Sequence, residues 1–344
     1  MDNQSIEIDG SLGEAGGQIL RTACALSAVK KIPCRVFNIR SGRPRPGLMT
    51  QHLLGIQALN SLCNGRLEGD YLGSQEIKFW PGEIKPRDLH VKIGTAGSII
   101  LVLQTLIPLV LFSPEPVKII FEGGSSDGFF SPTIDYFRYV FLGIMEKAGL
   151  KVGVNILKRG FCPEGGAKAE VKVFPAKIKG LNLTERGKLN KILIISGASE
   201  SLKNKKVSER QIAGVREVLG KLKLPLEEKA EYYEASCPGS QITLIAEFDN
   251  TVIGTANVGK LGKRAEDVGK ETALELLQEA KSDTCLDKHI ADQILPYLAL
   301  ASGKSQVSVS EITEHCKTNI SVIEKFIEGK FEIKDNLINW QPNI

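Results

Sequence analysis

A threefold alternation of helix and strand patterns constrains this fold more than any single motif does. Three apolar segments are predicted helices, and each is followed by a turn, a strand-like run, a second helix and a further strand. The three segments are GGQILRTACALSAVKK (16–31), AGSIILVLQTLIPLVLF (96–112) and ADQILPYLALASGK (291–304). The pattern predicts an α/β (α+β) chain in which three repeated αβαβ modules pack around a shared core. The alternative is an ordinary α/β chain whose elements merely alternate.

The second helix of each copy follows a polar junction at the end of a strand. In the second copy, Ser131 is the expected N-cap and Pro132 the first helical residue. In the third copy, Thr318 or Asn319 is the expected cap. Helix N-termini present unpaired backbone N–H groups and a positive dipole end, so all three junctions suit anions.

A separate small domain is predicted to interrupt the repeats. Residues 184–283 contain a strand (KILIISGAS), a helix (SERQIAGVREVLGKLK), a hairpin (SQITLIAEFDNTVIGTANV) and a charged helix (AEDVGKETALELLQEAKS). These elements make a βαββα domain of ordinary size. The expected divisions are 1–183 for the core with the first two repeats, 184–283 for the inserted domain, and 284–344 for the core with the third repeat.

Composition narrows the class of protein. The 344 residues carry a formal net charge of +4, which is compatible with a polyanionic partner. Seven cysteines without a C-x-x-C pair argue against a disulfide framework and a zinc ribbon. The N-terminus lacks the pattern of a signal peptide, and the apolar run 98–112 is too short to span a bilayer. A cytoplasmic protein is expected.

Arginines gather at the junction of the first copy, NIRSGRPRPGLMTQHL. Arg40, Arg43 and Arg45 lie within six residues on a loop stiffened by glycine and proline. Guanidinium groups bind phosphate oxygens in a bidentate way, so this loop is a candidate phosphate site. A solvated basic turn is an equally good interpretation. Upstream, the turn DGSLGEAGGQILR places Glu14, a possible Mg²⁺ ligand, before Arg21.

The third copy contains two of the four histidines. His315 lies in its junction, SEITEHCKTNI, although a lone histidine more often belongs to a solvated face. In the preceding DKHIADQIL, His289, Asp292 and Gln293 occupy about one helical turn. Asp292 and Gln293 could bind the edge of a purine base or simply cap a helix.

Three other kinds of site are excluded by sequence. The segment GTANVGKL resembles a phosphate-binding loop but has Leu261 where a Ser or Thr should bind Mg²⁺. The histidines and cysteines lack the spacing of a zinc site. No G-x-S-x-G motif supports Ser-His-Asp hydrolysis.

Six segments, in order, resemble the RNA 3′-terminal phosphate cyclases, in their archaeal and bacterial ATP-dependent branch. The resemblance covers essentially the whole chain. The matching segments are IDGSLGEAGGQILRTACALSA, NIRSGRPRPGLMTQHL, GTAGSIILVLQTLIP, RGFCPEGGAKAEV, HIADQILPYLALA and HCKTNISVIEKF. The family architecture, three αβ modules and one inserted domain, agrees with the prediction from the pattern.

The resemblance implies ATP-dependent conversion of an RNA 3′-phosphate to a 2′,3′-cyclic phosphodiester. A histidine would take AMP from ATP, AMP would pass to the RNA 3′-phosphate, and the neighbouring 2′-OH would close the ring and release AMP. ATP and RNA with a 3′-phosphate end are the implied partners, and Mg²⁺ or Mn²⁺ is the implied metal.

The resemblance also assigns roles to single residues. His315 would be the nucleophile, and Glu14 would help to hold the metal. Two larger sets follow from it. The ATP or AMP pocket would be formed by Gln104, Pro132, His289, Ile290, Ala291, Asp292 and Gln293. The ATP phosphates or the RNA end would be bound by Arg21, Arg40, Arg43 and Gln51.

The sequence departs from the family pattern at two positions, and one alternative function has to be considered. Ala167 replaces the third glycine of a family signature, which affects loop detail. His289 stands where many relatives stack a tyrosine on adenine, so nucleotide preference is in question. The rival is a cyclase-like branch of non-catalytic RNA-binding proteins of ribosome assembly, which lacks the nucleophilic histidine. This chain retains it as His315.

Overall fold

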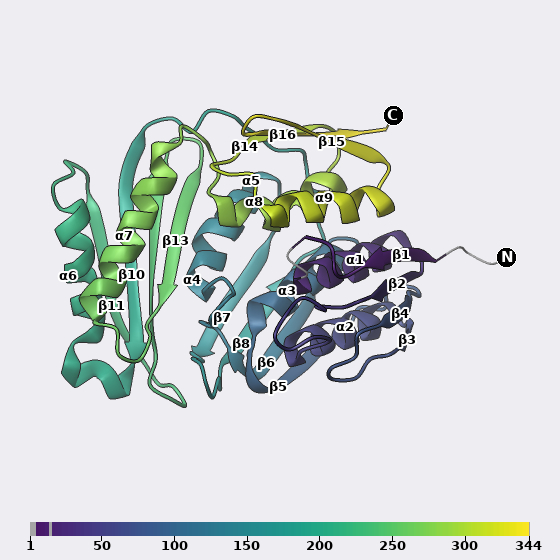
Figure 1. The fold of residues 1–344 in the computed structure, drawn as a ribbon, viewed down its shortest axis with the longest axis horizontal. Helices are drawn as coiled ribbons and strands as arrows, with labels where there is room; N and C mark the ends of the chain where they lie inside the picture. Colours follow the sequence, from purple (N-terminus) through teal and green to yellow (C-terminus); the bar gives the residue numbers. More distant parts are fainter. Residues whose placement is uncertain (1–4, 14–15, 344) are drawn as a thin grey trace.

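The computed structural model describes residues 5–13 and 16–343 as a mixed α/β fold with four four-stranded sheets (Figure 1). The first unit contains β1 (Ile6–Asp9), α1 (Gly17–Lys30), β2 (Cys34–Phe37), α2 (Thr50–Cys63), β3 (Arg66–Glu68) and β4 (Ile77–Trp80). The second contains β5 (Leu89–Ser98), α3 (Ile99–Val110), β6 (Val117–Ser125), α4 (Ile134–Tyr136), a π-helical turn η1 (Phe137–Phe141), α5 (Leu142–Lys147), β7 (Val152–Lys158) and β8 (Lys168–Val173).

The third unit is split by the fourth sheet. Its elements are β9 (Asn182–Leu183), α8 (Lys288–Leu300), β14 (Ser305–Ser308), α9 (Glu314–Phe326), β15 (Gly329–Lys334) and β16 (Leu337–Pro342). Between β9 and α8 lie β10 (Leu189–Ser199), the 3₁₀ turn η2 (Glu200–Lys205), α6 (Val207–Leu219), β11 (Leu226–Tyr233), β12 (Ser240–Phe248), β13 (Val252–Val258) and α7 (Ala265–Lys281).

Three of the sheets share one pairing pattern. In each, the two strands that flank the first helix are parallel, and a C-terminal hairpin adds two antiparallel strands. The strand orders are β1-β2-β4-β3, β5-β6-β8-β7 and β9-β14-β16-β15. The αβαβ prediction was therefore incomplete, because it omitted the strand before each first helix and treated the final hairpin as one strand.

The inserted segment forms its own sheet, in the order β11-β10-β12-β13. The predicted βαββα order missed β11, which pairs parallel to β10 with Ile192 opposite Leu226. Its sequence, LEEKAEYY, alternates charged residues without a strong apolar face. Helices α6 and α7 cover this sheet and share a separate hydrophobic cluster with it. In Figure 1 the inserted sheet and its two helices lie to the left of the other three units.

Two predicted helix starts were wrong. Helix α4 begins at Ile134 with Thr133 as N-cap, so Ser131 and Pro132 precede the helix. Helix α9 begins at Glu314, and the Thr313 hydroxyl accepts a hydrogen bond from the backbone N–H of Cys316. In both helices the observed cap is a threonine whose hydroxyl accepts a backbone N–H that would otherwise be unpaired, which stabilises the helix start at that residue.

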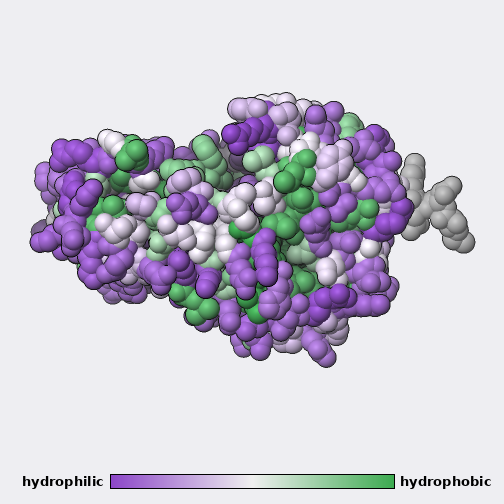
Figure 2. All heavy atoms as spheres, turned by 90° about the horizontal axis from the view of Figure 1, so that it is seen from below, coloured by the Kyte–Doolittle hydropathy of each residue, from purple (hydrophilic) through white to green (hydrophobic). Residues whose placement is uncertain are grey.

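Helix α3 confirms the interpretation of the apolar run 98–112 as a buried helix. Ser98 caps it, and nearly all of its side chains are buried. Helix α3 packs against α1, α2 and α8. The large hydrophobic core continues across the sheets of the three units that share one pairing pattern. On the face seen in Figure 2, hydrophilic residues surround separate hydrophobic patches. Among the described residues, no helix is both long enough and apolar enough to cross a membrane.

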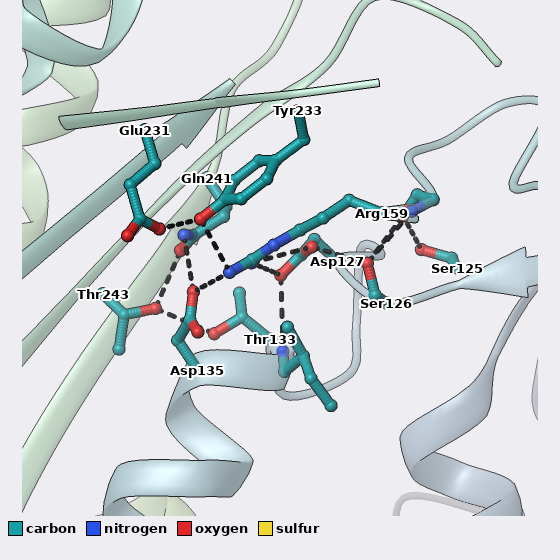
Figure 3. Close-up of polar contacts among 12 residues, drawn as sticks. Ser125, Ser126, Asp127, Thr133, Asp135, Arg159, Glu231, Tyr233, Gln241 and Thr243 are labelled. Carbon is teal, nitrogen blue, oxygen red and sulfur yellow. Dashed lines mark hydrogen bonds and ion pairs between the residues drawn. The ribbon is translucent and has the colours of Figure 1, made fainter. Parts of the chain in front are cut away.

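A buried ion-pair network joins the second unit to the inserted sheet (Figure 3). Arg159 follows β7 and donates hydrogen bonds to Asp127 (3.2 Å) and Asp135 (2.7 Å). From the inserted sheet, the Tyr233 hydroxyl accepts from Arg159 at 3.1 Å, and Gln241 donates to Asp135 at 2.9 Å. Because both carboxylates are buried, the guanidinium is their main compensating charge.

Removing Arg159 should therefore destabilise the protein strongly. We expect Arg159→Ala to lower the free energy of unfolding by about 3–5 kcal/mol, because two buried carboxylates lose their partner. Denaturant unfolding followed by circular dichroism measures this. Lys118→Ala is the matched control, since the pair of Lys118 with Glu170 is partly exposed and should matter far less. Equal losses in the two variants would contradict the expectation.

Candidate functional site

The N-termini of α1 and α9 bring the predicted phosphate and nucleophile residues together. Gly16 is the N-cap of α1. A Cβ atom placed on Gly16 would lie 3.4 Å from Cε1 of His315 and 3.6 Å from a terminal nitrogen of Arg43. His315 and Arg43, 272 positions apart in sequence, thus border the same small space at the start of α1.

His315 occupies the second position of α9 and is half-buried. Thr313 caps the helix two residues before His315, and Glu314 is the acidic residue of its first turn. The partial positive charge of a helix N-terminus favours an anion next to this imidazole. The sequence placed His315 in the junction before this helix, with Thr318 or Asn319 as the cap. Because Thr313 is the cap, His315 lies inside the first turn instead.

Positive charge accumulates around this point. Arg40 has a left-handed backbone (φ 53°), and its guanidinium donates to the carbonyl oxygens of Arg45 (2.6 Å) and Gly47 (3.0 Å). Burial and the neighbouring charge of Arg43 lower the pKa of Arg40. These bonds hold the loop of the first junction in a fixed shape, which a purely solvated turn would not need.

His52, which the sequence analysis did not single out, lies against the same cluster. Burial, together with the nearby charges of Arg21 and Arg40, lowers the pKa of His52 to about 3, so the ring is neutral. Its Nδ1 accepts the backbone N–H of Met49 at the start of α2 (3.3 Å). A side chain on Gly17 would overlap this ring, so the close approach of α1 to α2 requires glycine.

A second polar group connects α1 with α8. The Gln18 side chain donates to Oδ2 of Asp292 at 2.7 Å. Burial raises the pKa of Asp292 to about 7, although the charge of Arg21 acts in the opposite direction. Burial likewise lowers the pKa of Arg21 to about 10. Asp292 is thus the acidic partner of an otherwise cationic site.

Asn319 ties α9 to both of these helices. It lies one turn after His315 and is buried. Its Oδ1 accepts from the Thr22 hydroxyl on α1, and its Nδ2 donates to the backbone carbonyl of Asp292 on α8, both at 2.7 Å. Sequence reasoning treated Asn319 as a helix cap and overlooked Gln18 and Thr22. Their spacing around Arg21, on an otherwise apolar helix, is the pattern that would have indicated them.

A cavity of about 30 Å³ lies between α1, α3, α8 and α9. Four predicted residues line it, namely Arg21, Gln104, Asp292 and Gln293. Gln104 donates to Gln293 at 2.9 Å, and Gln293 donates to the carbonyl of His289 at 2.6 Å. A space of this size holds about one water molecule. The two hydrogen-bonded glutamines form part of its wall.

The remaining predicted residues lie outside this cavity. His289 is exposed at the start of α8, whereas the side chains of Ile290 and Ala291 are buried in the core. Pro132 is half-buried ahead of α4. Gln51 borders Gly97 at the end of β5, since a Cβ on that glycine would lie 3.1 Å from its Oε1. Glu14 is outside the described residues.

The start of α8 is anchored by Asp287, which is fully buried. Its carboxylate accepts from the Tyr136 hydroxyl (2.6 Å), from the backbone N–H groups of His289 and Ile290 (3.0 Å each), and from that of Gly254 (3.1 Å). Burial raises the pKa of Asp287 even so. Because Gly254 is on β13, the inserted sheet directly supports the helix that carries His289, Asp292 and Gln293.

No cluster of three or more His, Cys, Asp or Glu side chains suited to a metal occurs within residues 5–13 and 16–343. In the part of the chain that the structure describes, the site is built for an anion, with arginines and two helix N-termini directed at one space.

Comparison with known proteins agrees with this chemistry. Residues 12–333 match the family model for RNA 3′-terminal phosphate cyclase. Proteins named RNA 3′-terminal phosphate cyclase are similar over almost the whole chain. The one from Pyrococcus abyssi is 44% identical over 329 residues, covering 95% of each chain. The one from Pyrococcus furiosus is 43% identical over 330 residues, covering 96% of this chain and 95% of the relative.

Solved structures add no further argument about the fold. The enolpyruvyl transferase NikO from Streptomyces tendae aligns with 98% of this chain and 82% of its own, but at a TM-score of 0.23 and 8% identity. The family match and the near-complete coverage of relatives above 40% identity are decisive: the chain belongs to the RNA 3′-terminal phosphate cyclase family.

Proposed function

We propose that this protein converts the 3′-terminal phosphate of RNA to a 2′,3′-cyclic phosphate at the expense of ATP. Family membership supports the reaction. For this chain the main support is the position of His315. It lies in the first turn of α9, and both His315 and Arg43 border the space next to Gly16.

In the first step, a ring nitrogen of His315 attacks the α-phosphorus of ATP. A P–N bond forms, the bond to the β-phosphate oxygen breaks, and pyrophosphate leaves. Arg21, Arg40 and Arg43 are proposed to bind the phosphates, since guanidinium groups stabilise charge that moves onto the leaving oxygens. Histidine suits this role because a nitrogen of its uncharged imidazole is a nucleophile that can form a covalent intermediate.

In the second step, an oxygen of the RNA 3′-phosphate attacks the phosphorus of the histidine-bound AMP. The P–N bond breaks, His315 is regenerated, and the RNA end carries a pyrophosphate bridge to AMP. The vicinal 2′-OH then attacks the terminal phosphorus, and AMP leaves. Without activation, ring closure would have to expel an oxygen of the phosphate monoester, which is a poor leaving group, whereas AMP is a good one. The 2′-OH is on the neighbouring carbon, so it is already next to the phosphorus that it attacks.

The nucleotide is proposed to bind along α8 and α3. Asp292, Gln293 and Gln104 would contact the base or ribose, and His289 would stack on it from the exposed end. Ile290 and Ala291 would contribute through their backbone, and Pro132 would lie at the margin. For Gln104 and Gln293 to take part, their mutual hydrogen bond has to open. Gln51 is assigned to the phosphates or the RNA end.

A divalent metal, Mg²⁺ or Mn²⁺, is proposed to neutralise the ATP phosphates, with Glu14 as its protein ligand. The proposed divisions of the chain stay at 1–183, 184–283 and 284–344. The three units with the same pairing pattern are proposed to be repeats of one module around a shared core.

His315→Ala should abolish covalent labelling by ATP. In the proposed first step, the imidazole of His315 forms the bond to the α-phosphorus, and alanine has no group that could replace it. The measurement is incubation with α-labelled ATP, followed by denaturing electrophoresis, on protein whose folding is confirmed by circular dichroism. His90→Ala is the matched control, because His90 is an exposed histidine on β5 and should label normally. Full labelling of His315→Ala would refute the assignment.

Arg40→Ala and Arg43→Ala should each slow cyclisation about tenfold to hundredfold. Each removes a charge-assisted contact with phosphate, worth about 1.5–3 kcal/mol. Arg45→Ala serves as the control on the same loop, since its side chain is exposed and only its carbonyl oxygen bonds to Arg40. If all three variants cyclise RNA at one rate, the loop is only a solvated turn.

Tyr136→Phe should raise the KM for ATP several-fold with a smaller change in kcat. The variant removes one hydrogen bond to Asp287 and so loosens the first turn of α8, which is a binding element and not the nucleophile. Steady-state kinetics of RNA cyclisation at varied ATP concentration and saturating RNA measure both constants. Tyr139→Phe, on the neighbouring turn, is the control. A loss of thermal stability with an unchanged KM would show that Asp287 has a structural role alone.

A further inference from the structure

Two exposed loops carry large apolar side chains that the reaction proposed above does not use. Phe129 and Phe130 lie between β6 and α4, and their side chains are 38% and 105% exposed. Leu261 lies between β13 and α7 and is 107% exposed. A fully exposed phenylalanine and leucine bury no apolar area in this chain, so the hydrophobic effect within the fold does not explain them.

The two loops meet, although they are about 130 positions apart in sequence. The ammonium group of Lys260 lies 5.8 Å from the centroid of the Phe129 ring. Together, Phe129, Phe130, Lys260 and Leu261 define what we call the Phe129–Lys260 surface. Within the ion pairs of the described residues Lys260 has no carboxylate partner, so its charge faces a ring and solvent.

The first loop has a rigid base. Just before it, the backbone N–H of Ser126 donates to the carbonyl of Gly160 at 3.0 Å. Asp127 is fully buried, and its Oδ1 accepts the backbone N–H of Ile134 at 3.3 Å, which ties the two ends of the loop together.

Phe130 itself has a left-handed backbone, with φ 61°. A bulky side chain in this region costs conformational energy, which persists only where the surroundings impose it. The loop therefore presents two phenyl rings to solvent at a cost to the fold.

The Phe129–Lys260 surface is connected through the fold to the helix proposed to bind the nucleotide. Tyr136, six residues after Phe130, donates to Asp287 at the start of α8. The strand that leads to Lys260 is β13, and its Gly254 N–H bonds to the same carboxylate. Both loops therefore extend from elements that contact the first turn of α8.

We propose that the Phe129–Lys260 surface binds the unpaired nucleotides that precede the 3′-phosphate of an RNA substrate. The proposal rests on the proposed function, which supplies the RNA. Phenyl rings stack on bases whatever their sequence, and an adjacent ammonium group contacts the phosphate backbone. Leu261 adds apolar contact at the edge of the stack.

The charge of the second loop favours RNA over a protein partner. Residues 259–264, GKLGKR, contain three cations and no acid. Lys263 and Arg264 also contact Glu271 and Glu266 on α7, which leaves Lys260 as the cation nearest the rings. A polyanion with flat, apolar bases fits cations and exposed rings at once, whereas a protein interface would need a larger apolar area.

The double variant Phe129→Ala/Phe130→Ala tests this surface. We expect it to bind single-stranded RNA about five- to hundredfold more weakly, which corresponds to the loss of stacking on about one base. Fluorescence anisotropy with an unpaired oligonucleotide ending in a 3′-phosphate measures the Kd. Phe129→Tyr/Phe130→Tyr keeps both rings and should retain the affinity. Lys260→Ala should weaken binding and reduce its salt dependence by about one ion.

Phe112→Ala is the matched control, because Phe112 is 49% exposed at the end of α3 and belongs to neither loop. Covalent labelling by ATP, which needs no RNA, is measured on every protein. Absent labelling of the unaltered protein contradicts the proposed function, whereas RNA affinity tests the surface separately. Unchanged affinity in the double variant overturns the surface as an RNA site and leaves a protein partner as its use. Equal weakening by Phe112→Ala, or no RNA binding by the unaltered protein, overturns it as well.

Discussion

The hydrogen bonds of Asn319 hold together three helices that lie far apart in the sequence. One amide accepts from Thr22 on α1 and donates to the backbone of Asp292 on α8, while it belongs to α9 itself. Both bonds are short, and the one to Thr22 is fully buried, so it is difficult to replace by solvent. His315 lies one turn earlier on the same helix. Its position relative to the arginines of the first unit and the acid of the third unit therefore depends on this one side chain.

The inserted sheet is joined to the second unit and to α8 by buried polar contacts. Arg159 and its two aspartates contact Tyr233 and Gln241 of this sheet, and Asp287 receives a bond from Gly254. Buried charges with several partners tolerate little displacement, because any lost partner leaves a desolvated group. The inserted sheet is thus coupled to α8 by directional contacts as well as by apolar packing, in which Ile195 and Ile245 join the main core.

The sequence predicted the features that depend on local spacing. The buried helix at 98–112 follows from periodicity, and the arginine-rich loop before α2 follows from its turn residues. Features that depend on distant pairing could not be found in this way. Strand β9 has two residues and exists only because Gln306 and Val307 pair with them. The bond between Gln104 and Gln293 joins residues 189 positions apart. The charged strand β11 lacks the apolar alternation that would identify it.

The same limit applies to the candidate site. The charged residues were visible in the sequence, since three arginines in a loop of glycine and proline are conspicuous, as is a histidine in a polar junction. The residues that orient them, Gln18, Thr22 and Asn319, are ordinary polar side chains on helices. Their role comes from burial and from partners on other helices, neither of which is encoded by local spacing.

The glutamine pair in the wall of the small cavity has a thermodynamic consequence. A ligand group that takes its hydrogen bonds from both amides must first separate Gln104 from Gln293. The observed affinity is then the intrinsic affinity multiplied by the fraction of molecules in which the pair is open. Losing one such bond costs about 0.5–1.5 kcal/mol, unless the ligand replaces it. A ligand that offers both a donor and an acceptor to the two amides recovers this cost, whereas an apolar group of the same size does not. The paired glutamines therefore favour ligands with a matching donor and acceptor over apolar ligands of the same shape.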